Sequence, residues 1–123
     1  MIKGSRVASV EDHLPLKPVV CLVLLALAEK ERHGYAVMLA VRERSHGRIR
    51  LETGPLYRHL KRLVDTGLVE EADGRSAVED DQRRRCYYRL TGLGRAVVTA
   101  EGARLATLVE ATRAVGLLEE ETA

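Results

Sequence analysis

The chain has 123 residues, of which 46% are hydrophobic and 31% are charged. This size and balance predict one folded domain with a sizeable core rather than two domains. The formal net charge of +2 is too close to neutral to indicate a class of partner. Aromatic residues make up only 3%, with no Trp or Phe, so the core must consist of Leu, Val and Ala, which favours helices.

The cysteines and the apolar segments give the expected compartment. Cys21 and Cys86 lie far apart and form no paired-thiol motif, so we expect reduced thiols in a cytoplasmic protein, with no metal and no cofactor. The apolar run 19–28 is similar to the apolar part of an export signal, but Glu11 and Asp12 precede it where a signal is basic. It is also too short to cross a bilayer, which needs about 20 residues. We therefore expect no membrane partner.

Helix signals dominate the first half of the chain. Prolines at 15 and 18 mark the start of a helix expected over about 16–29, since proline is tolerated in a helix's first turn, and a polar turn follows at 30–33. A second amphipathic helix is predicted over 34–45, and Gly47 ends it. After an extended link at 48–51, Thr53 is expected to cap a third helix with Pro55 at its first position. Leu residues at 56, 60 and 63 give that helix one buried stripe, and Gly67 closes it.

The second half of the chain predicts a hairpin and one long helix. Residues 68–71 are predicted to form a strand, and a long polar tip joins them to the alternating residues 85–90, which are predicted to form the returning strand. Thr91 can cap a last helix whose apolar stripe runs from Leu93 to Leu118, a length of about 39 Å. Such a helix cannot bury its whole stripe on one small domain, so we expect a second copy of the chain to cover the rest. The alternative is a helix that folds back on its own domain.

Three helices followed by a hairpin predict a mainly α fold with a small β-hairpin, the winged helix-turn-helix, whose third helix enters the DNA major groove. Positive charge is concentrated in that region, because residues 42–95 hold thirteen basic and nine acidic side chains, whereas residues 96–123 hold two and five. Double-stranded DNA is therefore the expected partner, with base or phosphate contacts from the third helix and cationic contacts from the wing. The expected DNA-binding residues are Thr53, Gly54, Tyr57, Arg58, Lys61, Arg62, Arg75, Arg83, Arg84 and Arg85.

Several motifs at characteristic spacing resemble the PadR family of bacterial transcriptional regulators. They are Gly34-Tyr35, the segment 54–63 that begins Gly-Pro-Leu-Tyr, the segment 67–69, and the segment 87–94 that contains Tyr-Arg-Leu-Thr. The resemblance spans about residues 16–118 and implies a homodimeric repressor of the short-tailed subfamily, in which the first and last helices pack against the partner chain. The implied interface contains Leu22, Val23, Val97, Ala100, Leu108, Ala111 and Val115.

The resemblance also implies a division of the chain and a regulating ligand. The division is an N-terminal flexible arm (1–14), a winged helix-turn-helix domain (15–90), a dimerisation helix (91–118) and an acidic tail (119–123). Some family members bind a small effector at the dimer interface, often against a tryptophan, which this sequence lacks. An effector pocket lined by Val19, Leu22, Val23 and residues of the last helix is an alternative, but a place in the protein core is the favoured explanation of these residues.

Two other classes of protein compete with this interpretation. An enzyme is disfavoured because the four histidines are scattered and no nucleophile or metal motif is present. Each histidine is better explained as a surface or cap residue, although His59 could touch DNA. A winged domain used only for protein association is the second alternative, but it predicts a neutral third helix. A redox role for Cys86 is disfavoured because its strand alternation points the thiol inward.

Overall fold

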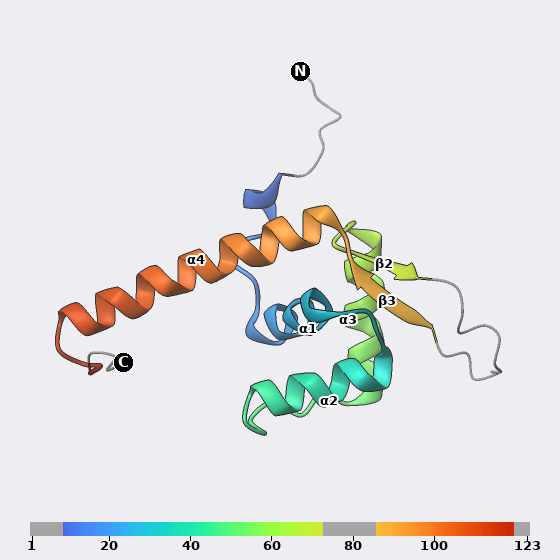
Figure 1. Ribbon diagram of the computed structural model, residues 1–123, viewed down its shortest axis with the longest axis horizontal. Helices are drawn as coiled ribbons and strands as arrows, with labels where there is room; N and C mark the ends of the chain where they lie inside the picture. Colours follow the sequence, from blue (N-terminus) through green and yellow to red (C-terminus); the bar gives the residue numbers. More distant parts are fainter. Residues whose placement is uncertain (1–8, 73–85, 120–123) are drawn as a thin grey trace, which may run out of the picture.

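The computed structural model describes residues 9–72 and 86–119 (Figure 1). Its elements, in chain order, are the short 3-10 helix η1 (Val10–His13), α1 (Pro18–Glu29), β1 (Arg32–His33), α2 (Gly34–Arg44), α3 (Thr53–Asp65), β2 (Val69–Ala72), β3 (Tyr87–Leu90) and α4 (Gly92–Ala114). The four helices and the two hairpin strands were all predicted, and their order is confirmed. Within the described residues, no helix is long and apolar enough to span a bilayer.

The core forms where α1 packs against α2, α4 and β3. Val23 and Leu24 of α1 are fully buried, as are Val37 of α2 and Val97 of α4, and the buried stripe of α3 completes the core with Leu56, Leu60 and Leu63. The strongly apolar sequence of α1 follows from this central position. Burying one such side chain contributes about 1.5–3 kcal/mol to the stability of the fold. The three buried leucines of α3 therefore hold this helix firmly in place against the core.

The sheet has three antiparallel strands in the order β1-β3-β2, one more than predicted. The residues expected to form a plain turn at 30–33 include β1, in which Arg32 pairs with Tyr88 and His33 with Tyr87. A two-residue strand carries no alternating pattern, and only the neighbouring β3 makes it a strand. The hairpin register pairs Val69 with Leu90 and Ala72 with Tyr87.

The start of α3 differs from the prediction by two positions. Glu52 precedes the helix as its N-cap without a side-chain capping hydrogen bond, Thr53 is the first helical residue and Pro55 is the third. Proline is tolerated throughout the first turn because the amides there have no partner within the helix. The capping role predicted for Thr53 was therefore wrong. The ending at Gly67 is confirmed, since its φ of 85° lies in the left-handed region.

The last helix is capped as predicted but ends earlier. The Thr91 hydroxyl accepts a hydrogen bond from the Gly94 amide at 3.0 Å. The helix stops at Ala114, and the chain turns at Gly116, whose φ is 80°. The C-terminal half of α4 projects away from the other helices (Figure 1), so the alternative in which it folds back on its own domain is wrong.

Candidate nucleic-acid interface

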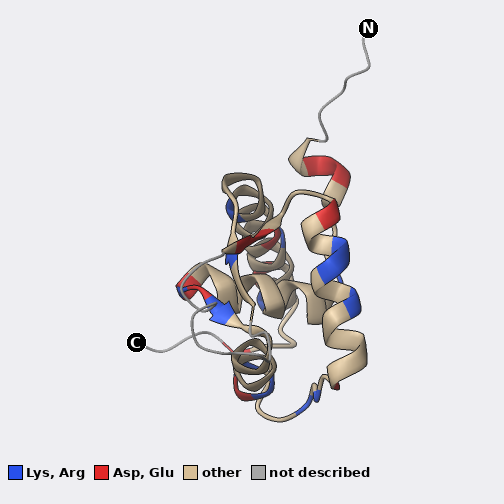
Figure 2. Cartoon of the chain, turned by 90° about the vertical axis from the view of Figure 1, so that its right-hand side faces the viewer, with Lys and Arg blue, Asp and Glu red and all other residues tan. Residues whose placement is uncertain are grey.

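Helix α3 has one buried and one exposed face, as the spacing of its leucines predicted. Tyr57, Arg58, Lys61 and Arg62 all lie on the exposed face. Thr53 and Gly54 are exposed at the start of the same helix. Figure 2 marks the basic positions of α3 in blue along its ribbon. The helix can therefore present these side chains to a partner without unpacking the core.

Tyr57 is anchored more firmly than the sequence suggested. Its side chain is 45% exposed, but its ring lies directly over Gly34 at the start of α2. A Cβ atom at position 34 would lie only 2.7 Å from the Tyr57 ring carbon that bears the hydroxyl. Gly34 is thus needed for this close approach, not only to begin a helix. The contact ties α3 to α2 and fixes where the tyrosine hydroxyl lies.

The cations of α3 differ in whether they have an acidic partner. Lys61 forms an ion pair with Asp65, with 3.2 Å between its Nζ and the Asp65 Oδ2 atom. Both side chains are well exposed, so such a pair contributes little to stability and can open when another anion approaches. Arg58 and Arg62 form no ion pair within the described part of the chain. They are the α3 side chains most available to an anionic partner.

His59 of α3 lies near several positive charges. Burial lowers the pKa of His59, and the positive charges of Lys17, Arg62 and Arg58 lower it further. The imidazole is therefore neutral at neutral pH. Lys17 stands at the N-cap of α1, far from α3 in the sequence. The sequence analysis missed this positive charge, and only the folded chain brings Lys17 near enough to His59 to act on it.

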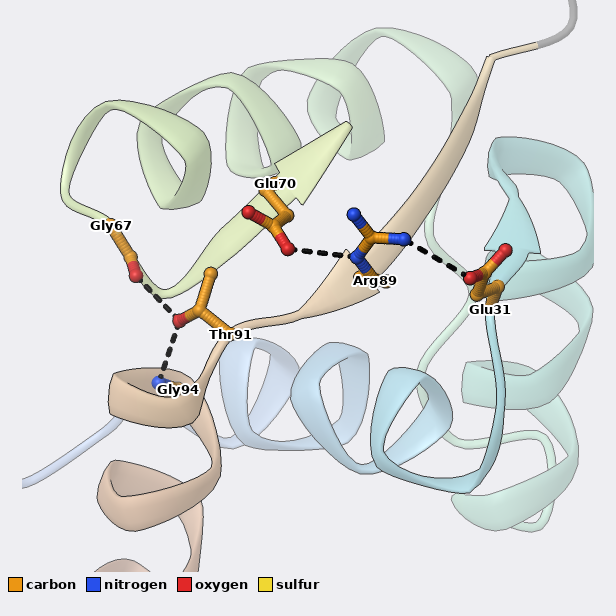
Figure 3. Close-up of polar contacts among 6 residues, drawn as sticks. All are labelled: Glu31, Gly67, Glu70, Arg89, Thr91 and Gly94. Carbon is orange, nitrogen blue, oxygen red and sulfur yellow. Dashed lines mark hydrogen bonds and ion pairs between the residues drawn. The ribbon is translucent and has the colours of Figure 1, made fainter. Parts of the chain in front are cut away.

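The base of the wing is held by polar contacts that Figure 3 shows. The Arg89 guanidinium lies between two carboxylates, with 2.8 Å from its Nε to the Glu70 Oε2 atom and 3.4 Å from its Nη1 to the Glu31 Oε2 atom. The Thr91 hydroxyl also donates to the Gly67 carbonyl at 2.6 Å. Arg89 is therefore a structural cation. The predicted wing contacts lie outside the described residues, namely Arg75, Arg83, Arg84 and Arg85.

Both cysteines have thiols that favour the protonated form. Burial is the main cause that raises the pKa of Cys21 and of Cys86. Cys86 is half-buried beside the core, on the side of the strand that its alternation with Tyr88 predicted. A thiol whose pKa is raised reacts slowly, because the thiolate is the nucleophile.

The predicted interface residues fall into two groups. Val23 and Val97 are completely buried in this chain's own core, which leaves them no surface for a second chain, so their inclusion in an interface was wrong. Leu22 and Ala100 are half-buried, and Ala111 is exposed. Leu108 is 51% exposed on α4, whereas Val115 is 69% exposed just beyond the helix end. The uncovered apolar surface on α4 and its C-terminal turn consists of Leu105, Leu108, Val109, Val115, Leu117 and Leu118.

Comparison with solved structures identifies the class of fold. A transcriptional regulator from Clostridium thermocellum shares 18% identity and a TM-score of 0.63, covering 92% of this chain and 96% of that one. A PadR family transcription regulator from Clostridium difficile is 22% identical with a TM-score of 0.65, and the match covers 80% of this chain and 98% of that one. Bacillus subtilis PadR in complex with operator DNA is 19% identical with a TM-score of 0.59, and the match covers 68% of this chain and 46% of that one. The fold is a winged helix-turn-helix extended by one long helix.

The sequence comparison then gives the family. The model of the transcriptional regulator PadR-like family matches residues 23–100, more than half of the chain. An uncharacterised protein of Lysinibacillus sphaericus is 30% identical over 78 residues, which are 63% of this chain and 69% of that protein. The chain belongs to the PadR-like family of transcriptional regulators, as the sequence motifs predicted.

Proposed function

We propose that this chain is a sequence-specific DNA-binding transcriptional regulator that acts as a dimeric repressor and catalyses no reaction. The observation that carries the proposal is the exposed face of α3, where Arg58 and Arg62 have no acidic partner among the described residues. The opposite face of the same helix is locked into the core, so the cations have a fixed direction. A rigid basic helix of this kind suits the major groove.

Each side chain of α3 has a proposed role. Arg58 and Arg62 carry planar guanidinium groups that can bind guanine O6 and N7 in a bidentate manner. Tyr57 is held by Gly34, so its hydroxyl can contact a base edge or a phosphate at a fixed place. Thr53, Gly54 and Lys61 would position the phosphate backbone, and the wing residues Arg75, Arg83, Arg84 and Arg85 would add sequence-independent contacts.

The dimer proposal depends on the uncovered apolar surface of α4. Five of its leucine and valine side chains are at least 40% exposed, at positions 105, 108, 115, 117 and 118. An apolar stripe of this kind usually marks an interface. Two copies joined along α4 would present two copies of α3 to half-sites about one helical turn apart on a two-fold operator. A small effector would then act by changing the spacing of the two α3 helices.

The alternative function is a winged domain that only associates with other proteins. It would require that the cations of α3 serve solubility alone. The unpaired arginines favour the DNA-binding function, because a surface that only needs solubility has no reason to separate its cations from acidic partners.

The test is fluorescence anisotropy with labelled duplex from upstream of the chain's own gene, beside a scrambled duplex, at several salt concentrations. We expect the wild type to bind the specific duplex at least about 10³-fold more tightly. Arg58→Ala should weaken specific binding by about 1–3 kcal/mol, with a smaller loss on the scrambled duplex. Lys30→Ala is the matched control, because it removes an exposed positive charge from the loop between α1 and β1.

Two outcomes would contradict the proposal. Equal losses for Arg58→Ala and Lys30→Ala would mean that α3 reads no bases. Binding that is equally weak for every duplex, also after selection from genomic fragments, would favour the protein-association alternative.

A further inference from the structure

A groove of about 320 Å³ lies between α2 and the start of α3, beside the proposed recognition surface. It is lined by Tyr35, Met38, Leu39, Arg42, Arg50, Leu51, Glu52 and Thr53. The function proposed above uses only Thr53 from this set. The groove therefore contains two arginines, a tyrosine and an apolar floor that have no assigned role.

The two arginines of the groove have no acidic partner among the residues that the structure describes. Arg42 and Arg50 are both exposed, and neither forms an ion pair within the part of the chain that the structure describes. Arg44, only two positions after Arg42 on the same helix, forms an ion pair with Glu29. One arginine of α2 is thus held by the fold, whereas the other is left available together with Arg50.

The groove continues into the exposed face of α3. Thr53 lines the groove, and the next residue, Gly54, lies beside the Arg58 side chain. The Nη1 atom of Arg58 is 3.7 Å from the place where a Cβ atom of Gly54 would be. Figure 2 shows further basic residues in the turn that leads into α3, below those on the helix itself. A partner that lies along α3 therefore meets Arg58 first and the groove next.

The chemistry of the groove fits one strand of a nucleic-acid backbone. Two guanidinium groups and a tyrosine hydroxyl can bind phosphate oxygens, and Tyr35 is 59% exposed. Leu39, which is 42% exposed, offers an apolar contact for a sugar ring. Glu52 is the one acidic side chain in the groove, and its charge opposes a phosphate.

We propose that this groove binds the phosphodiester backbone of DNA next to the base pairs that α3 contacts, with Arg42 and Arg50 as the phosphate ligands. The inference rests on the proposed function, because it assumes that α3 lies on DNA. It adds a second contact surface that positions α3 and carries no sequence information. On the side of α3 that faces α2, this groove would position α3 on DNA without a contribution from the wing.

The test compares Arg42→Ala, Arg50→Ala and Arg44→Ala in the same anisotropy assay, with specific and scrambled duplexes. Each of the first two variants should weaken both duplexes by the same factor, and Arg44→Ala is the control because Glu29 already holds its charge. One lost phosphate contact lowers the salt slope by about one. The affinity deficit of each variant should therefore shrink by about 3.5-fold between about 50 and about 200 mM salt.

Glu52→Gln is a variant with the opposite expected sign. Removal of the opposing charge should tighten binding to both duplexes by the same factor. Wild-type affinities and salt slopes in Arg42→Ala and Arg50→Ala would overturn the proposal, and so would a loss confined to the specific duplex. If Arg58→Ala still loses specificity in that case, the proposed function stands and only the groove inference fails. If the wild type itself shows no specific binding, both fail.

Discussion

Gly94 is the place where the last helix crosses the start of the wing, and a methyl group there should destabilise the protein. A Cβ atom at this position would lie inside contact distance of the Leu68 carbonyl oxygen, 3.0 Å from the Leu68 carbonyl carbon and 2.9 Å from the Leu90 Cδ1 atom. The same Leu68 carbonyl accepts a hydrogen bond from the Thr91 amide at 3.1 Å. A backbone atom cannot move aside as a side-chain end can, so α4 would have to shift away from β2.

The expected loss of stability is the balance of two destabilising contributions and one stabilising contribution. Overpacking of this kind costs about 1–3 kcal/mol, and loss of the Thr91 hydrogen bond adds about 1 kcal/mol. Replacement of glycine by alanine in a helix would by itself stabilise it by about 0.5–1 kcal/mol. We therefore expect Gly94→Ala to lower the free energy of unfolding by about 1–3.5 kcal/mol. This is a large part of the total free energy of unfolding of a typical domain, which is roughly 5–15 kcal/mol.

The matched control is Gly92→Ala in the same helical turn. Nothing lies within 4 Å of a Cβ atom at Gly92, so only the favourable helix effect remains, and the variant should be unchanged or slightly stabilised. Urea unfolding followed by circular dichroism measures both variants, at one protein concentration because association would add to stability. Equal stability of Gly94→Ala and Gly92→Ala would refute the argument that this crossing is tight.

Two further changes test α4. Leu108→Glu places a charge on a side chain that is 51% exposed in one chain. If two copies associate along α4 as proposed, we expect this variant to be monomeric at micromolar concentration in sedimentation while the wild type is dimeric, since burying an unpaired charge costs several kcal/mol. A variant that is as dimeric as the wild type would remove α4 as the interface. Hydrogen bonds from Arg104 hold the pKa of the buried Glu101 below its ordinary value of 4.5. The carboxylate therefore stabilises the fold above that value, and this stability is lost as pH falls through the folded-state pKa. Glu101→Gln should melt at a lower temperature than the wild type at neutral pH, and the difference should shrink in acid; a difference that is constant with pH would contradict this role.

Much of the site could be predicted from α3 because its pattern is local. Leucines at 56, 60 and 63 repeat at helical spacing, which places Arg58 and Arg62 on the opposite face whatever the helix packs against. The Thr91 cap was also predictable, because a capping side chain bonds an amide three residues later. The start of α3 was misplaced because Thr53 and Glu52 are both acceptable before a proline, and only the backbone decides between them.

Contacts between distant segments could not be predicted. The strand β1 exists only because Arg32 and His33 lie beside β3, more than fifty positions later. The Glu101 carboxylate accepts hydrogen bonds from the Leu16 amide at 3.3 Å and from Arg104, which joins α4 to the start of α1. Val97 was predicted to lie in the dimer interface, whereas the structure places it fully buried in the core of its own chain.

The sequence by itself determined the order of the elements, the buried face of α3 and the family, because hydrophobic spacing, caps and short motifs act within a few residues. The tertiary structure alone decided which cations are available, since an ion pair depends on where two side chains end in space. Arg44 and Arg89 are held by carboxylates from other elements, whereas Arg42, Arg50 and Arg58 form no ion pair with any residue of 9–72 and 86–119. That difference arises because charges interact over distance in the folded chain, not over distance in the sequence.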